Sequence, residues 1–113
     1  MTLRRGDIHW IEFPPSSTRE QVGRRPAIIL QGETTTTLPT VFVVPLTTNP
    51  RAARFAGTFA VEPSPRNGLP GRSIVLAFQL RALDRTRIGQ RIGSLEPADL
   101  VALDGHLRSL LSL

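Results

Sequence analysis

The stretches PAIILQ at residues 26–31 and TVFVVPL at residues 40–46 decide the fold of this chain. Each is a short, nearly continuous apolar run, which is typical of a strand that is buried on both faces. A further strand is predicted at residues 7–13. Pro14 and Pro15 end it, because proline supplies no amide hydrogen to a strand ladder. The chain therefore begins as a series of short, buried strands.

The rest of the chain continues this pattern and then changes period. We expect strands at residues 55–62 and 72–78, a continuation of the second one after a bend at 79–84, and a last strand at 89–93. After Pro97, leucines recur at spacings of three and four, which predicts an amphipathic helix packed against the sheet. These leucines are Leu100, Leu103, Leu107, Leu110 and Leu111. The predicted fold is mainly β (α+β) with a C-terminal amphipathic helix.

Length and composition limit the class of protein. A chain of 113 residues with 40% apolar residues is suited to one domain, expected to span residues 1–113. The sequence contains no apolar run of the roughly 18 residues that a membrane span needs, and an acid follows Arg4 and Arg5 in place of an apolar signal-peptide core. We therefore expect a soluble, cytoplasmic protein. With no cysteine, it has no disulfide and no thiolate metal site.

The basic residues are all arginine, 14 in number, and the net charge is +5. Residues 51–95 contain eight arginines and two carboxylates, a local net charge of +6. Arginine binds phosphate through two hydrogen bonds and stacks on bases, so this stretch predicts a surface that attracts polyanions. A solvated basic face without a ligand is the alternative interpretation.

The residues that suit phosphate chemistry lie near the ends of two predicted strands. Cleavage of RNA by its own 2′-hydroxyl requires a proton acceptor, charge stabilisation at phosphorus, and protonation of the leaving 5′-oxygen. Arg25 precedes a proline and so has an extended backbone, and its charge suits the phosphorane. Thr47 can hydrogen-bond a phosphate oxygen, and Glu20 is a nearby carboxylate that could accept the proton. Alternatively, all three residues are ordinary loop and strand-end residues.

Metal-dependent and two-histidine mechanisms are not favoured. The nine carboxylates are scattered and include no D-x-D or D-x-E pair of the kind used in two-metal sites. His9 is expected on a strand and His106 on the helix, and we expect both at ordinary surface positions. No metal and no cofactor are predicted.

Four motifs spread over nearly the full chain resemble those of the MazF/PemK family of toxin endoribonucleases. They are RGD at residues 5–7, EQ-V-G-R-RP at 20–26, PLT at 45–47 and SIVLAFQLR at 73–81. The loop of that family often reads GSEQ, whereas an arginine, Arg19, precedes the glutamate here.

The resemblance implies an SH3-like barrel of the CcdB/MazF type, a homodimer and a cognate antitoxin of a type II toxin–antitoxin system. The implied activity is sequence-specific, metal-independent cleavage of single-stranded RNA, which leaves a 2′,3′-cyclic phosphate and a 5′-hydroxyl. Arg25 and Thr47 match the family's leading catalytic pair, and Glu20 ranks third. The residues expected to contact RNA are Arg19, Gln21, Arg24, Thr48, Asn49, Ser73 and Arg81.

Two other classes of function remain open. A CcdB-like barrel can act by binding gyrase and needs no residues that cleave phosphodiesters, and a related barrel can bind RNA without cutting it. The matches at Arg25 and Thr47 favour the nuclease, because a protein that only binds has no need of that pair.

Overall fold

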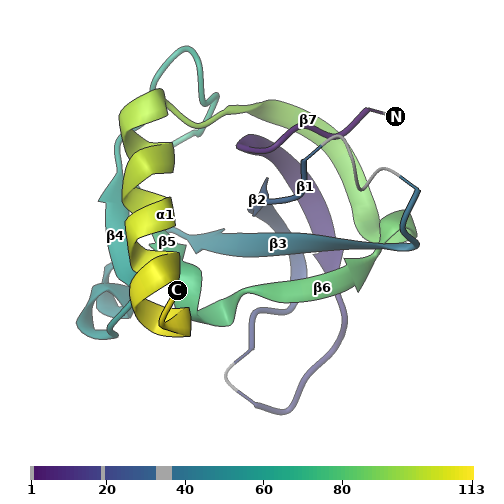
Figure 1. Cartoon of the computed structure of the whole chain (residues 1–113), viewed down its shortest axis with the longest axis horizontal. Coiled ribbons are helices and arrows are strands. Elements are labelled where there is room, and N and C mark those ends of the chain that lie inside the picture. The colour runs from purple at the N-terminus through teal and green to yellow at the C-terminus, as the bar shows by residue number, and fades with distance from the viewer. Residues whose placement is uncertain (1, 19, 33–36) are drawn as a thin grey trace.

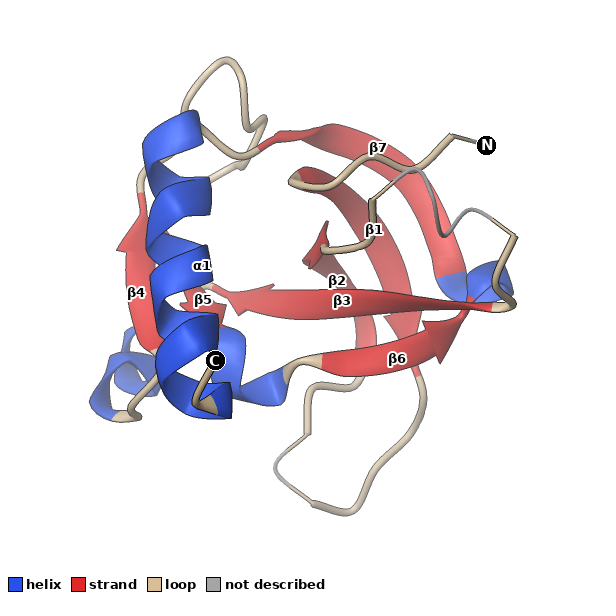
Figure 2. Cartoon of the chain, in the orientation of Figure 1, coloured by secondary structure: helices blue, strands red, loops and turns tan. Residues whose placement is uncertain are grey.

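The fold is a strongly curved antiparallel sheet with a C-terminal helix packed against it (Figure 1). The computed structural model describes residues 2–18, 20–32 and 37–113. Three short 3-10 helices, at Pro50–Arg54, Ala77–Gln79 and Arg85–Arg87, join some of the strands (Figure 2). The main elements are β1 (Asp7–Phe13), β2 (Gly23–Ile29), β3 (Thr40–Thr47), β4 (Thr58–Val61), β5 (Ser73–Leu76), β6 (Arg81–Asp84), β7 (Ile88–Ser94) and α1 (Pro97–Leu111). The predicted mainly β fold with a C-terminal helix is confirmed.

β3 is the centre of the sheet because it pairs with three other strands. Its first half pairs with β6, and its last two residues, Leu46 and Thr47, pair with β5. Between Val43 and Pro45 it also pairs with β2, and the sheet continues from β2 to β1 and β7. β3 therefore links the β4–β5 pair to the rest of the sheet, and it ends at Thr47.

Two groups of buried side chains lie on opposite faces of β1, β2 and β3, because alternate residues of a strand face opposite sides. Leu103 of α1 belongs to the first group, so the helix packs over β4 and β5 (Figure 1). The first group includes Ile8, Ile28, Val44, Leu46, Val61 and Val75. The second includes Ile11, Ala27, Ile29, Val41, Val43, Leu83 and Ile88. The prediction that β2 and β3 are buried on both faces is thus confirmed for residues 27–29 and 43–47, whereas Phe42 is exposed.

The N-terminal RGD motif ties three parts of the fold together. Arg5 forms an ion pair with Asp104 of α1. The buried Asp7 carboxylate accepts a hydrogen bond from the Ser94 hydroxyl at 2.7 Å and pairs with Arg91 at 3.3 Å. The contacts of this motif are therefore with α1 and β7, which gives it an architectural role.

The connection from β4 to β5 is held by one buried side chain. Asn67 is 0% exposed, and its Nδ2 donates to the Glu62 carbonyl at 2.9 Å. Its Oδ1 accepts the backbone N–H groups of Ser64 and Leu69 at 2.9 and 3.0 Å. The connection also packs against β7 at Gly93, where an added Cβ would lie 2.5 Å from the Asn67 carbonyl oxygen. Glycine is required there for this close approach.

Several predicted element boundaries were wrong. β2 begins at Gly23, before the predicted start at residue 26, because its ladder with β1 extends to the pair Phe13 and Gly23. The segment 79–84 continues after a bend, as predicted: a 3-10 helix turns the chain at Ala77–Gln79, and β6 then pairs with β3 beyond the part that β5 pairs with. β4 is shorter than the predicted strand at 55–62.

The expected surface positions of the histidines were wrong for His9. It is 2% exposed, and its Nδ1 donates to the Gly89 carbonyl at 2.9 Å. His106 is half-buried and stacks on Phe59, with ring centroids 5.1 Å apart. The two histidines make these contacts on different elements, as predicted.

The helix has the predicted extent, with Pro97 in its first turn. Leu103 is fully buried, whereas Leu110 and Leu111, which were also predicted to face the sheet, are exposed. Within the described part of the chain, no helix has the length and apolarity needed to cross a membrane.

Candidate functional site

The register of β2 and β3 brings Arg25 and Thr47 to the same face of the sheet. The last pair of their ladder is Ala27 opposite Pro45. Side chains two positions apart along a strand share a face, so the next same-face positions are Arg25 on β2 and Thr47 on β3. Arg25 and Thr47, which are 22 positions apart in the sequence, therefore lie on the same face of adjacent strands, each two residues beyond the last ladder pair.

Local hydrogen bonds orient both side chains. The Arg25 Nε donates to the Val22 carbonyl at 2.9 Å, which holds the guanidinium against the end of the β1–β2 connection. Thr47 is 8% exposed, and its Oγ1 accepts the Asn49 N–H at 3.2 Å. As an acceptor in this bond, the Thr47 hydroxyl keeps its own hydrogen for another partner.

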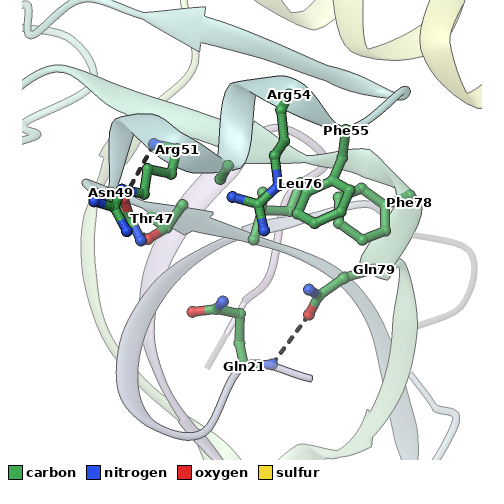
Figure 3. A pocket seen from close by; sticks show the side chains of 10 residues that line it. Gln21, Thr47, Asn49, Arg51, Arg54, Phe55, Leu76, Phe78 and Gln79 are labelled. Carbon is green, nitrogen blue, oxygen red and sulfur yellow. Dashed lines mark hydrogen bonds between the residues drawn. The ribbon is translucent and has the colours of Figure 1, made fainter. Parts of the chain in front are cut away.

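A groove of about 450 Å³ opens beside Thr47 (Figure 3). It lies between the end of β3, two 3-10 helices and the β1–β2 connection. Asn49 forms its rim, where the Oδ1 accepts the Arg51 N–H at 3.0 Å and caps the 3-10 helix that follows. The full lining is Gln21, Thr47, Asn49, Arg51, Ala52, Arg54, Phe55, Leu76, Phe78 and Gln79. Arg25 is not part of this lining.

Two contacts attach the β1–β2 connection to the rest of the site. The Gln79 Oε1 accepts the Gln21 N–H at 3.0 Å. Glu20 forms an ion pair with Arg81 at 3.0 Å, in a neighbouring cleft of about 410 Å³. Phe78 and Gln79 line both the groove and this cleft. Glu20 therefore lies beside the groove and not in it.

The other predicted RNA contacts are placed differently. Arg24 is exposed. It lies on the same face of the sheet as Glu12, its partner across the β1–β2 ladder, and its guanidinium lies 4.3 Å from the ring centroid of Trp10. Thr48 is exposed next to the groove. Ser73 is 2% exposed and donates to the Gly71 carbonyl at 3.1 Å, so its hydroxyl is not presented to a bound strand. Arg19 lies outside the described residues.

The candidate residues from the sequence did not include Arg51, Arg54, Phe55 and Phe78. A signal for the first two was present, because Asn49 followed by Pro50 is a common start of a short helical turn. The spacing of Arg51 and Arg54 places both on one side of a 3-10 helix, which has three residues per turn. For Phe78, the sequence contained no comparable signal, since only the β3–β5 pairing brings it near.

The arginines of residues 51–95 do not form one basic surface. Arg72 pairs with Glu62 at 2.9 Å, and Arg66, Arg85 and Arg87 donate to backbone carbonyls on separate parts of the fold. Of the eight, Arg51, Arg54 and Arg81 line the groove or the cleft beside it. Only a few of the arginines predicted to form a basic surface therefore contribute positive charge at the site.

The acidic side chains with shifted pKa values are not part of the groove lining. Hydrogen bonds from the side chain and backbone of Thr86 lower the pKa of Asp84, and burial raises the pKa of Asp99 in the first turn of α1. Among the described residues, no three His, Asp or Glu side chains are grouped so that they could hold a metal ion.

Comparison with known proteins identifies the family. Residues 4–111 match the model of the PemK-like, MazF-like toxins of type II toxin–antitoxin systems. Endoribonuclease MazF of Staphylococcus epidermidis is 30% identical over 98% of this chain and 92% of its own. The crystal structure of MazF (Form-I) from Deinococcus radiodurans is similar with a TM-score of 0.80 and 29% identity, over 100% of this chain and 99% of that one.

A solved complex is similar as well. The MazE–MazF (Form-II) structure from Deinococcus radiodurans contains a chain that matches with a TM-score of 0.73 and 30% identity, over 100% of this chain and 98% of that one. The predicted SH3-like barrel of the CcdB/MazF type agrees with these structures and is confirmed. The chain belongs to the PemK-like, MazF-like toxin family of type II toxin–antitoxin systems.

Proposed function

We propose that this chain is the toxin of a type II toxin–antitoxin system and a sequence-specific endoribonuclease that cleaves single-stranded RNA without a metal ion. The 2′-hydroxyl attacks the adjacent phosphorus, the bond to the 5′-oxygen breaks, and the products carry a 2′,3′-cyclic phosphate and a 5′-hydroxyl. The observation that carries the proposal is that Arg25 and Thr47 share one face of adjacent strands and that Thr47 lines an open groove. The names of the curated relatives, endoribonucleases, support it.

The proposed roles follow from the chemistry of each side chain. The Arg25 guanidinium stabilises the charge that develops on the phosphorane oxygens. The Thr47 hydroxyl, whose oxygen already accepts from Asn49, donates its hydrogen to a nonbridging phosphate oxygen. Because arginine is itself a weak acid, Arg25 shares the protonation of the leaving 5′-oxygen with water.

Glu20 is the proposed acceptor of the 2′ proton. It is the one carboxylate among the described residues that line the groove and the neighbouring cleft. Its ion pair with Arg81 holds it next to Gln79, so it must turn from Arg81 toward the substrate in order to act. For this reason it ranks below Arg25 and Thr47.

The proposed path of the RNA follows the groove. Gln21, Thr48 and Asn49 are its polar contacts, and Arg81 attracts phosphates from the neighbouring cleft. Arg24, on the opposite face of β2, contributes only longer-range attraction. Arg19 remains a proposed contact from the sequence. We leave Ser73 out of the path because its hydroxyl is buried.

We also propose a homodimer, formed through an apolar face of the molecule. A hollow of about 510 Å³ is lined by Leu30, Phe42, Leu80, Leu107, Leu111 and Leu113, with Arg5, Asp104 and Arg108 at the charged positions. Phe42, Leu111 and Leu113 are 47%, 52% and 83% exposed. A face that is apolar and also carries both signs of charge is suited to a second copy of itself. The cognate antitoxin, acting in the cytoplasm, would cover the RNA groove with an acidic segment.

The proposal is tested by incubating the purified protein with single-stranded RNA in EDTA and identifying the ends of the products. We expect cleavage in EDTA, with a cyclic phosphate on one fragment and a 5′-hydroxyl on the other. An Arg25→Ala protein prepared in parallel controls for contaminating nucleases. Products with 5′-phosphates, or cleavage only after Mg²⁺ is added, would contradict the mechanism. A folded protein that inhibits gyrase or binds RNA without cutting it would support the corresponding alternative class.

A further inference from the structure

One wall of the groove is aromatic, which phosphate binding alone does not require. The rings of Phe55 and Phe78 are in contact, with centroids 5.3 Å apart and planes at 49°. The Arg54 guanidinium lies 4.6 Å from the Phe55 ring centroid. Figure 3 shows this guanidinium between the aromatic pair and the Thr47 side of the groove. A planar cation that rests on a phenyl ring leaves its other face open for a second flat group.

The Gln21 side chain, which lines the same groove, carries a polar atom without a partner. The side-chain oxygen of Gln21 is buried and accepts no hydrogen bond from any described residue. The backbone of Gln21 is fixed by its bond to Gln79, and Figure 3 shows the carboxamide rising from that point toward Thr47 and Arg54. A buried carbonyl without a donor is unfavourable, so a ligand that brings an N–H group to it gains affinity.

We propose that Gln21, Arg54, Phe55 and Phe78 form a base slot, which binds one nucleobase of the RNA next to the scissile phosphate. The base stacks on Arg54, which Phe55 supports from behind, and its edge hydrogen-bonds the Gln21 carboxamide. A nucleobase is the part of RNA that combines a flat π face with N–H donors. Thr47, the proposed phosphate contact, lines the same groove, so the slot reads a base beside the cleavage point. This inference rests on the proposed function and deepens it.

The chemistry of the Gln21 edge gives a test that shifts specificity. A carboxamide offers one donor and one acceptor, whereas a carboxylate offers acceptors only. Guanine carries two neighbouring donors, N1–H and N2–H, that match a carboxylate. We therefore expect that Gln21→Glu, when it cleaves a randomised RNA pool, enriches guanine at one position of the cut sites. The expected enrichment is about tenfold, which is the scale of discrimination by one good bidentate contact.

Gln90→Glu is the matched control. Gln90 is an exposed glutamine on β7 outside the groove lining, and its substitution makes the same change of charge. We expect its cut sites to match those of the wild type. Gln21→Ala provides a second reading: it should flatten the preference at that one position and leave the others as they are. Unchanged preferences in both Gln21 variants, or a change spread evenly over all positions, would overturn the base slot.

The proposed stacking of the base is tested by Arg54→Lys, which keeps the positive charge but removes the planar guanidinium. Binding is measured with the cleavage-deficient Arg25→Ala protein as background, using one RNA and a copy that lacks the base at the slot position. We expect Arg54→Lys to weaken binding of the intact RNA at least fivefold and to leave binding of the abasic copy nearly unchanged. Equal losses for both RNAs would mean that Arg54 binds phosphate, and the base slot would be rejected.

The two levels of the proposal fail in different ways. If the wild-type protein does not cleave, but the Arg25→Ala protein discriminates bases at one position through Gln21, the nuclease proposal fails and the slot stands. If the wild type cleaves in EDTA and the Gln21 variants keep its preferences, the nuclease stands and the slot fails.

Discussion

At the scale of single residues, the consecutive arginines of β2 face opposite sides of the sheet. Arg24 pairs across the ladder with Glu12 and lies over Trp10, whereas Arg25 shares the face of Ile11 and is held by the Val22 carbonyl. Because side chains alternate along a strand, Arg24 is placed for long-range attraction of RNA, and Arg25, on the other face, is suited to transition-state stabilisation. The two arginines should respond differently to substitution.

We expect Arg25→Ala to lower kcat by about 10² to 10³, the usual cost of removing a donor that stabilises transition-state charge. Single-turnover cleavage of a defined RNA measures the effect, and thermal unfolding checks that the fold is intact. Arg72→Ala is the control, because it removes an arginine from an exposed ion pair with Glu62 outside the groove. A kcat for Arg25→Ala within tenfold of the wild type would remove Arg25 from the mechanism.

The hydroxyl of Thr47 can be tested with two substitutions of similar size. Thr47→Val keeps the shape and removes the acceptor of the Asn49 N–H, so we expect cleavage to slow and stability to fall by about 1 kcal/mol. Thr47→Ser retains the hydroxyl and should keep most of the activity. Rates and urea unfolding of the two variants are compared directly. Equal rates would show that the hydroxyl takes no part in cleavage.

At the scale of elements, the connection between β4 and β5 illustrates how an irregular segment can be fixed without regular hydrogen bonding. Its prolines and glycines prevent a strand or a helix, and the Asn67 side chain supplies the missing partners for backbone groups on both sides. Because the segment also packs against Gly93, it connects the β4–β5 pair to β7.

Asn67→Ala should therefore be strongly destabilising for a loop substitution. It removes the partners of two backbone N–H groups and one carbonyl, and each buried group left unpaired costs about 1 to 3 kcal/mol. We expect the free energy of unfolding in urea to fall by about 3 kcal/mol. Gln90→Ala, at an exposed strand position, should change it by less than about 0.5 kcal/mol. An unchanged midpoint for Asn67→Ala would contradict this account of the loop.

The boundaries of elements were harder to predict from the sequence than their existence. Apolar runs identified β1, β3 and the leucine face of α1, because burial depends on residue type. The start of β2 depends on its register with β1. Arg24 and Arg25 are polar, but they belong to the strand because they pair with residues of β1. The burial of His9 likewise depends on the Gly89 carbonyl of a distant strand. Such pairings do not appear in local composition.

At the scale of the whole molecule, the most exposed apolar side chains are divided between two places. Leu111 and Leu113 belong to the hollow that also contains Phe42, whereas Val101 is 71% exposed on α1 and does not line it. The sequence identified Leu111 as part of a helix face but assigned it to the core. Leu103 packs among the buried side chains of the core, whereas Leu111 lies outside that group.

This division predicts the outcome of two charge substitutions on the same helix. Leu111→Glu should convert the proposed dimer to a monomer in sedimentation measurements, because it places a carboxylate in the apolar hollow. Val101→Glu should leave the dimer intact. A wild-type chain that is monomeric at tens of micromolar, or a Leu111→Glu variant that sediments like it, would contradict the proposed interface.

The site shows the same dependence on the whole fold. Arg25 and Thr47 could be proposed from the sequence because motifs mark the ends of their strands. The wall made by Arg54, Phe55 and Phe78 could not be proposed from the sequence. It forms where two 3-10 helices, more than twenty residues apart in the chain, are brought together by the pairing of β3 with β5.

The contact between Arg24 and Trp10 also provides an optical signal. The chain has one tryptophan and no tyrosine, so its near-ultraviolet emission comes from the indole of Trp10. That indole lies 4.3 Å below a guanidinium proposed to attract phosphates. A polyanion that draws Arg24 away from the ring alters the surroundings of the fluorophore and hence its intensity and emission maximum. Ligand titrations of this protein can therefore be followed without a dye, from a reporter already built into β1.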